Sequence, residues 1–484
     1  MNLSQPLLTD LYQMTMAQGY WEQGHLDTQA CFHMNFRDYP FKGGYAIACG
    51  MDQLAELVDN FTFDDEDIEY LASLPAPGGG RLFKPEFLKF LQETPLSLDV
   101  DAVPEGTVVF PHEPLVRVVG PIWQCQLIET PLLNCVSFQT LIATKAARIC
   151  LAAEAPVAEF GLRRAQGAAG GVWASRAAVV GGCASTSNIL AGKMFDIPVS
   201  GTHAHSWVMA FPDELSAFRA FAESFPTNCV LLVDTYDIEQ GLRNAITVGL
   251  EMKERGERLV GVRIDSGDLA WYAKLARKML DEAGLTDCGV VLSNDLDEMT
   301  IRSIRQQGAQ VASWGVGTKL ATAFDQPTLG GVYKLSATKE GNGPWVDHLK
   351  ISGSNIKLTV PGLLDIRRYF NECGTLAGDM VFDTNAPAPA KDVIVDPFDD
   401  LRRKDLSGKS YQTLLQPLAR QGKSVLPDEY RDAMQAQRRT KENLSCLDET
   451  QTRLFNPHTY PVGLERSLWN RRHDLYAKLR GYEE

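Results

Sequence analysis

Acidic and hydroxyl-bearing residues stand directly after short apolar runs between residues 156 and 336. Asp265 and Asp268 flank a Ser-Gly pair, and carboxylates in such a turn suit Mg²⁺ or the hydroxyls of a sugar. Asp234 and Ser293 follow two other apolar runs in the same way. An Asp in this position is often only the N-cap of the next helix, and that simpler interpretation stays open for Asp268.

A glycine-rich segment and a pair of arginines could bind anions. Gly315-Val-Gly317-Thr318 follows a late apolar run, where glycines let backbone N–H groups approach a phosphate and Thr318 adds a hydroxyl. Arg163 and Arg164 form a fork suited to a carboxylate or a phosphate. The simpler alternatives are a plain tight turn for the glycines and a structural ion pair for one of the arginines.

Two histidines, His203 and His205, stand in the segment GTHAHS. An imidazole there could serve as a general base, a nucleophile or a metal ligand. The spacing is not specific for a metal, because a metal site needs further converging ligands and the chain has only eight His. His203 taken alone is more simply explained as a structural residue.

The elements that must position these residues alternate between apolar runs and helical patterns. This alternation predicts an α/β fold with a parallel sheet, and so many repeated units favour a closed or nearly closed α/β barrel. Polar residues after each strand would then meet at the carboxyl-terminal rim, where the active sites of such barrels lie. The predicted strands are 156–161, 197–201, 229–233, 259–264, 289–292, 309–314 and 331–336, separated by helices that include 212–225, 238–252, 268–284 and 296–308.

The flanking regions have a mixed pattern. Thr9 or Asp10 is a plausible N-cap for a first helix, and Pro131 is expected to break a long apolar helix near Thr130. The expected elements are helices over 7–21 and 122–153, strands over 30–37 and 107–110, and a Pro/Ala linker over 385–397 before a helical end.

Length, charge and cysteine usage narrow the class of protein. A chain of 484 residues predicts about two or three domains, and a net charge of −14 argues against nucleic acid as a partner. None of the ten Cys forms a CxxC pair, and their apolar surroundings favour a reducing cytoplasm. The first residues lack the pattern of a signal peptide and no run approaches 18 apolar residues, so we expect a cytoplasmic protein without a membrane span.

The same polar segments resemble the nicotinate phosphoribosyltransferase family. The resemblance runs from about residue 7 to residue 475, and the order and number of matching segments make it specific. The segments are LLTDLYQMTMAQGYW (7–21), QLIETPLLN (126–134), EFGLRRAQG (159–167), STSNILAGK (185–193), GTHAHS (201–206), VDTYD (233–237), GVRIDSGDL (261–269), SND (293–295), GVGTKL (315–320) and GGVYKLSA (330–337), with looser matches at KLTVPG (357–362) and NPHTYPVGL (456–464).

The resemblance implies a fold, an assembly and a reaction. The fold would be that of a type II phosphoribosyltransferase: an irregular α/β barrel over 126–340, and a mixed α/β domain built from 1–125 and from 341–484, which ends in a helical tail. Members of the family are homodimers with shared active sites. The reaction would join nicotinic acid to 5-phosphoribosyl 1-pyrophosphate, giving nicotinate mononucleotide and pyrophosphate in NAD salvage. ATP would be hydrolysed through a phosphohistidine.

The resemblance also implies roles for single residues. His205, the second histidine of GTHAHS, would be phosphorylated, and Asp265 would be a second catalytic residue. Mg²⁺ would enter with the pyrophosphate, with Asp265 and Asp268 as candidate ligands, and the aromatic residue at the nicotinate would come from the partner subunit. The contacting residues would be Tyr12, Arg163 and Thr202 for nicotinate, and Asp234, Asp268, Ser293, Gly315, Gly317, Thr318 and Thr359 for the phosphoribosyl and pyrophosphate groups.

Two alternatives stay open. The first is a phosphoribosyltransferase for nicotinamide or quinolinate on the same fold. A pocket that pairs a carboxylate with arginine disfavours neutral nicotinamide, because the arginine would lose its partner, and quinolinate would need a more basic pocket than Arg163 and Arg164 provide. The second alternative is a non-catalytic binding module for phosphosugars, which would bind tightly without releasing pyrophosphate.

Overall fold

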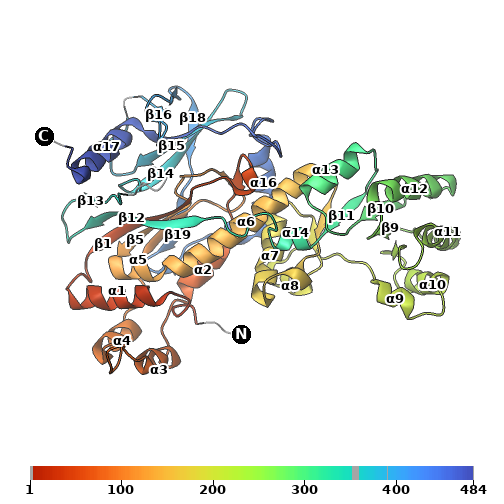
Figure 1. Ribbon diagram of the computed structural model, residues 1–484, viewed down its shortest axis with the longest axis horizontal. Coiled ribbons are helices and arrows are strands. Elements are labelled where there is room, and N and C mark those ends of the chain that lie inside the picture. Colours follow the sequence, from red (N-terminus) through yellow and green to blue (C-terminus); the bar gives the residue numbers. More distant parts are fainter. Residues whose placement is uncertain (1–3, 352–358, 390, 483–484) are drawn as a thin grey trace. The chain divides into compact units, whose positions relative to one another are not determined.

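The computed structural model describes residues 4–351, 359–389 and 391–482. The chain divides into two compact units, here called the terminal unit (Met1–Leu141 and Thr328–Glu484) and the barrel unit (Ile142–Pro327) (Figure 1). The first boundary falls inside the long helix α6 (Glu129–Ala153), which belongs to both units. The boundaries expected after residues 125 and 340 therefore differ from those in the structure.

The barrel unit is built on a six-stranded parallel sheet in the order β7-β6-β11-β10-β9-β8. Helices lie between its strands in the chain, and these strands are mostly buried, which explains their short continuous apolar runs. The four helices predicted after residue 210 are confirmed within two residues at each end. The elements are β6 (Val157–Glu159), η2 (Leu162–Arg164), α7 (Ala168–Val180), β7 (Ser185–Thr186), α8 (Ile189–Phe195), α9 (His205–Met209), α10 (Glu214–Ser224), β8 (Val230–Leu232), α11 (Ile238–Glu254), β9 (Gly261–Ile264), α12 (Leu269–Glu282), β10 (Gly289–Leu292), α13 (Glu298–Gln306), β11 (Ser313–Val316) and α14 (Thr318–Ala321).

An irregular segment fills the gap between the two edge strands, β7 and β8. Residues 197–201 form no strand, contrary to prediction, but a single parallel bridge joins Thr186 to Val199. On the other side, the Leu232 backbone N–H donates to His203 Nε2 at 3.2 Å. The His203 side chain thus takes the place of a backbone hydrogen-bond partner for β8, and the sheet closes as an irregular α/β barrel.

The terminal unit holds two larger sheets. The first has the order β13-β12-β1-β5-β3-β19-β20 and the second β17-β16-β21-β15-β14-β18. The predicted strand 331–336 is part of β12, which pairs antiparallel with β1 and so lies outside the barrel. The strands are β1 (Gln29–Phe36), β2 (Ala46–Ile47), β3 (Asp99–Ala102), β4 (Val108–Val109), β5 (Val116–Pro121), β12 (Gly331–Lys339), β13 (Val346–Asp347), β14 (Leu364–Phe370), β15 (Leu376–Asp383), β16 (Val393–Val395), β17 (Arg403–Asp405), β18 (Ser410–Thr413), β19 (Gln416–Arg420), β20 (Lys423–Ser424) and β21 (Val462–Glu465).

The helices of the terminal unit follow the sequence pattern closely. Asp10 is the N-cap of α1, as expected, and the predicted helix over 122–153 is interrupted at Ile128, just before the turn that contains Pro131. Helix α6 is the one described helix long and apolar enough to cross a membrane, but 78% of its most apolar window is buried, as in a core helix. The helices are α1 (Leu11–Glu22), η1 (Pro40–Lys42), α2 (Met51–Asp59), α3 (Asp65–Ser73), α4 (Pro85–Glu93), α5 (Ile122–Leu127), α15 (Asp428–Arg431), α16 (Ala433–Ser445) and α17 (Arg466–Arg480).

A fully buried charge cluster crosses the second sheet of the terminal unit. Arg368 of β14 faces Asp379 of β15 and donates three hydrogen bonds of 2.6–3.2 Å to its carboxylate. A second buried carboxyl, Glu113, lies 3.9 Å from Arg368. Burial raises the pKa of Glu113 well above its usual value, and the charge of Asp379 raises it further. Glu113 is therefore the member of the cluster that takes up a proton most readily.

Replacing Glu113 by Gln should flatten the pH dependence of stability. An unfolded Glu ionises near pH 4.3, whereas the raised pKa of the folded Glu113 means that it ionises only at higher pH. Its contribution is therefore fully present below about pH 4.3 and is lost as pH rises, at up to about 1.4 kcal/mol per pH unit. Unfolding measured at pH 5, 6 and 7 should show a shallower loss for Glu113→Gln than for the exposed control Glu69→Gln. Equal slopes in the two variants would contradict the assignment.

Candidate active site

The carboxyl-terminal rim of the barrel sheet gathers the polar residues that follow β8, β9 and β10. These strands run parallel in register, so their ends meet at one edge. The Asp265 backbone N–H donates to Asp234 Oδ2 at 2.9 Å, and the Ser293 hydroxyl donates to Asp265 Oδ1. Asp234, Asp265 and Ser293 are thus brought together at the predicted rim.

Arg263 of β9 connects the polar residues of this rim to one another. It was not predicted as a site residue from the sequence. Its guanidinium donates to Ser293 Oγ at 2.9 Å, Thr202 Oγ1 at 3.1 Å and Asp265 Oδ1 at 3.1 Å. Its Cζ atom lies 5.6 Å from the centroid of the Phe160 ring. Arg263 stands two residues before Asp265, a spacing that puts both side chains on one face of a strand, and this signal could have identified it.

The two histidines have different environments. His203 is buried, accepts the Leu232 N–H through Nε2, and has a pKa lowered by that burial. These contacts confirm its structural role. His205 begins α9, and 41% of its side chain is exposed. Its Nδ1 lies 3.2 Å from Thr235 Oγ1, and its Nε2 lies 4.0 Å from Asp234 Oδ1. Of these two histidines, His205 is the one whose imidazole is exposed at the rim.

Asp234 is a buried carboxylate with unequal oxygens. Oδ2 accepts hydrogen bonds from the Asp265 N–H and, at 2.6 Å, from the Ser266 hydroxyl. Oδ1 is buried without a hydrogen-bond partner, and its nearest cationic candidate is His205. An unpartnered buried carboxylate oxygen is costly, so this atom is placed to receive a proton or a ligand at the rim.

The glycines in and just after β11, Gly315 and Gly317, are required by close packing. A Cβ atom at Gly315 would lie 2.6 Å from the Phe160 ring and 3.2 Å from Ser293 Cβ. A Cβ at Gly317 would lie 3.0 Å from the Phe160 carbonyl oxygen. Thr318 then begins α14. Close packing accounts for both glycines, and their contact with a phosphate stays a prediction.

Cationic and capping side chains complete the rim of the barrel unit. Arg163 and Arg164 lie exposed in η2, and neither side chain forms a hydrogen bond or an ion pair with the described residues, so the structural ion pair considered for one of them is absent. Asp268 is the N-cap of α12, and its carboxylate accepts the Trp271 N–H at 3.0 Å. The capping interpretation is therefore confirmed for Asp268, with one carboxylate oxygen used by the cap.

Tyr12 and Thr359 belong to the terminal unit. Tyr12 lies on α1 with 49% of its surface exposed, so it is not a core aromatic, and its hydroxyl accepts a 3.3 Å hydrogen bond from Gln13. Burial and then the charge of Glu129 raise its pKa. Thr359 is buried, and its hydroxyl accepts the Lys350 N–H at 3.0 Å. The ligand roles of both residues stay predictions.

The carboxylates of the rim do not form a metal cage. Across the described parts of the chain, no three His, Cys, Asp or Glu side chains gather as a ligand set. Asp234 Oδ1, which has no hydrogen-bond partner, and Asp265 nevertheless offer oxygen atoms of the kind Mg²⁺ prefers. This donor set fits an ion that brings further ligands of its own.

Comparison with known proteins covers nearly the whole chain. Three family models match it in succession: the nicotinate phosphoribosyltransferase N-terminal domain over residues 7–137, the nicotinate phosphoribosyltransferase family over 156–346, and the corresponding C-terminal domain over 365–472. The nicotinate phosphoribosyltransferase of Bacillus subtilis is 42% identical over 471 residues, which cover 96% of this chain and 94% of the relative. The crystal structure of human nicotinic acid phosphoribosyltransferase matches with a TM-score of 0.83 at 33% identity, covering 96% and 99% of the two chains.

The irregular parallel barrel and the mixed-sheet unit define a type II phosphoribosyltransferase. Nicotinate-nucleotide pyrophosphorylase from Pyrococcus furiosus shares the fold, with a TM-score of 0.65 at 22% identity, covering 90% and 95% of the two chains. Within this class, the chain belongs to the nicotinate phosphoribosyltransferase family. The fold class and the family resemblance predicted from the sequence are both confirmed.

Proposed function

We propose that the chain joins nicotinate to 5-phosphoribosyl 1-pyrophosphate, releasing pyrophosphate, and that ATP hydrolysis through a phosphohistidine at His205 drives this step of NAD salvage. Family membership supports the transfer reaction. The observation that carries the ATP coupling is the half-exposed imidazole of His205, which lies between the Thr235 hydroxyl and the unpartnered Asp234 Oδ1.

His205 has the surroundings of a nucleophile. With Nδ1–H donated to Thr235 Oγ1, the Nε2 lone pair is free to attack the γ-phosphorus of ATP. The N–P bond forms as the bond between the γ-phosphorus and the bridging oxygen breaks, and ADP leaves. The Asp234 carboxylate, 4.0 Å from Nε2, stabilises the positive charge that develops on the ring. Water then cleaves the N–P bond and returns free His205 and phosphate.

The residues around Arg263 would hold the phosphoribosyl donor. In the transfer, the bond between ribose C1 and the pyrophosphate oxygen breaks, and the nicotinate nitrogen bonds to C1. Asp265, fixed by Arg263 and Ser293, offers an oxygen for the ribose hydroxyls and a negative charge beside a cationic C1. Mg²⁺ bound to the diphosphate would neutralise the leaving group. The remaining donor contacts would come from Asp234, Asp268, Gly315, Gly317, Thr318 and Thr359.

Nicotinate is a flat aromatic carboxylate and needs a ring and a cation. The Arg163 side chain is exposed and has no partner among the described residues, Thr202 is held by Arg263, and Tyr12 presents an exposed ring. We expect the chain to act as a homodimer with shared active sites, in which Tyr12 comes from the partner subunit. All ten cysteines lie among the described residues and none forms a disulfide, which suits a reducing cytoplasm.

Arg163→Ala should raise the KM for nicotinate far more than the KM for the phosphoribosyl donor. A charge-assisted hydrogen bond to a carboxylate contributes about 1.5–3 kcal/mol, which corresponds to about 10- to 100-fold in KM. Arg164→Ala is the matched control, since it removes an equally exposed cation from the next position. Initial rates with each substrate varied in turn would separate the two constants. Equal effects on both substrates would assign Arg163 a structural role.

The reaction is tested by measuring pyrophosphate release from the phosphoribosyl donor with Mg²⁺. Nicotinate, nicotinamide and quinolinate are compared in parallel, each with and without ATP. We expect release with nicotinate, increased by ATP. Release only with another acceptor would overturn the nicotinate assignment, and no release with any acceptor would favour the non-catalytic phosphosugar-binding module.

A further inference from the structure

Glu159 is a fully buried carboxylate at the carboxyl-terminal end of β6. One of its oxygens, Oε1, accepts the Gly161 backbone N–H. The other, Oε2, accepts the Thr186 hydroxyl at 2.6 Å and the Ser175 hydroxyl at 2.9 Å. Among the described residues no cation pairs with Glu159, so these three donors offset the cost of burying its carboxylate.

The first of these hydrogen bonds fixes η2, the turn that carries Arg163. Gly161 precedes η2 and donates its N–H to Glu159. The Gly161 carbonyl oxygen accepts the N–H groups of Arg164 at 2.8 Å and Ala165 at 3.1 Å, so both of its backbone polar groups are held. Because the Arg163 side chain has no partner among the described residues, the backbone of this turn sets where its guanidinium can reach.

The second oxygen of Glu159 connects η2 to the segment before Thr202. Thr186 lies in the edge strand β7, and its backbone pairs with the irregular segment that follows α8. Its N–H donates to the Pro198 carbonyl at 3.0 Å, and its carbonyl accepts the Ser200 N–H at 2.9 Å. Ser200 stands two residues before Thr202, so one carboxylate holds the backbone on both sides of the proposed nicotinate pocket.

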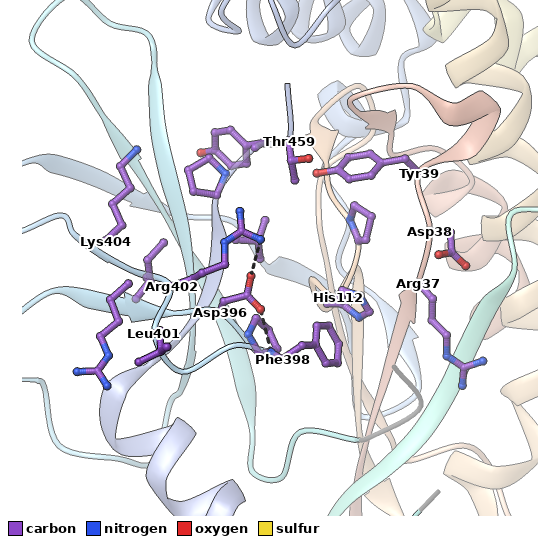
Figure 2. A pocket seen from close by; sticks show the side chains of 17 residues that line it. Arg37, Asp38, Tyr39, His112, Asp396, Phe398, Leu401, Arg402, Lys404 and Thr459 are labelled. Carbon is purple, nitrogen blue, oxygen red and sulfur yellow. Dashed lines mark hydrogen bonds and ion pairs between the residues drawn. The ribbon is translucent and has the colours of Figure 1, made fainter. Parts of the chain in front are cut away.

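Figure 2 shows a carboxylate of a different kind, in the terminal unit. Asp396 lines a cavity of about 600 Å³ there and lies 3.7 Å from Arg402, whose side chain is 71% exposed. Such a loose and solvated pair separates at little cost. Glu159 has no contact with solvent and its donors are buried with it, so its role is to hold the segments around it rather than to bind an ion itself.

We propose that Glu159 is the positioning residue of the nicotinate pocket, because its carboxylate fixes both the turn that carries Arg163 and the segment that leads to Thr202. This inference rests on the proposed function and adds to it the group that sets the place of the nicotinate carboxylate. Glu159 acts through its hydrogen-bond acceptors and not through its charge. Its loss should therefore weaken nicotinate more than the phosphoribosyl donor, which Asp265 would contact from the end of β9.

Initial rates with each substrate varied in turn test the proposal. Glu159→Leu keeps a side chain of similar size but removes both acceptors. We expect the KM for nicotinate to rise at least about tenfold, while the KM for the donor changes less than about twofold. Glu159→Gln keeps an acceptor for the Gly161 N–H and should restore most of the affinity. Glu214→Leu is the matched control, because it removes another buried carboxylate of the barrel unit, and it should leave the KM for nicotinate unchanged.

A milder variant keeps the test decisive if Glu159→Leu fails to fold. Ser175→Ala removes one donor to Oε2 and should raise the KM for nicotinate about two- to fivefold. The backbone amides of residues 160–165 should exchange hydrogen faster in this variant than in the wild-type chain. In the Arg163→Ala background the guanidinium is already lost, so Ser175→Ala should add almost nothing to the KM for nicotinate.

Three results would overturn the proposal: an unchanged KM for nicotinate in every folded variant of Glu159 and Ser175, equal rises for nicotinate and the donor, or a Glu159→Gln variant as impaired as Glu159→Leu. A full Ser175→Ala effect in the Arg163→Ala background would also contradict it. A wild-type chain that transferred nothing to nicotinate would refute the proposed function instead. Hydrogen exchange would then still decide whether Glu159 holds η2, because equal exchange in Ser175→Ala and wild type would show that it does not.

Discussion

His205→Ala should abolish ATP coupling and leave a slow, ATP-independent transfer. Among the described residues, His205 is the only exposed nucleophile at the rim with one ring nitrogen facing a hydroxyl and the other facing a buried carboxylate oxygen. Removing it leaves the contacts of Arg263 and Asp265 intact, so we expect the phosphoribosyl donor still to bind. We expect the ATP-stimulated part of the rate to fall by about 100-fold or more. Acid-labile ³²P labelling from γ-labelled ATP should fall to background.

His203→Ala is the matched control, because it removes the neighbouring imidazole. His203 Nε2 accepts the Leu232 N–H at the closure of the barrel, and leaving that donor unpaired costs about 1–3 kcal/mol of stability. This variant should therefore melt at a lower temperature yet keep the phosphohistidine label. Labelling that persists in His205→Ala and disappears in His203→Ala would show that His203 is the phosphorylated residue and that His205 is not.

Much of the barrel could be predicted because its strands are buried and its helices begin at clear caps. Val230–Leu232 and Gly289–Leu292 read as short apolar runs, since one face of a barrel strand packs against helices and the other lines the barrel interior, so both faces are buried. Asp237, Asp268 and Asp297 each accept an N–H in the first turn of the following helix, as capping rules anticipate. These signals are local, so a single sequence displays them.

The parts of the fold and of the site that were not predicted from the sequence depend on contacts between residues far apart in the chain. Strand β7 has only two residues, and its Thr186 hydroxyl is held at 2.6 Å by the buried carboxylate of Glu159. The alternating run in β12 suits either sheet, and its pairing with β1 decides which one it joins. Arg263 looked like an ordinary charge in an apolar strand, because its partners Thr202 and Ser293 come from other segments. The local pattern places Arg263 and Asp265 on one face of the strand, but it carries no information about the contacts to Thr202 and Ser293.

Arg263→Met should cause the largest loss of transfer activity in the barrel unit outside the histidine. The substitution removes three hydrogen bonds at once and leaves Asp265 without its cation. These hydrogen bonds are expected to position the phosphoribosyl donor. Their loss should therefore lower kcat/KM for that donor at least about 100-fold. Arg263→Lys keeps the charge but not the planar fork, so it should recover only part of the activity.

Arg277→Met separates this effect from simple destabilisation. The Arg277 side chain is 17% exposed, close to the 14% of Arg263, and it also donates three hydrogen bonds, to Asp281 and to the backbone of Leu285 and Cys288. Cys288 precedes β10, so Arg277 lies at the opposite end of the strands from the rim. Both variants should lower the melting temperature to a similar extent, but only Arg263→Met should lose transfer. A comparable loss of activity in Arg277→Met would mean that Arg263 acts through the stability of the barrel. Arg277 lies away from the rim, so its substitution can lower activity only by destabilising the barrel.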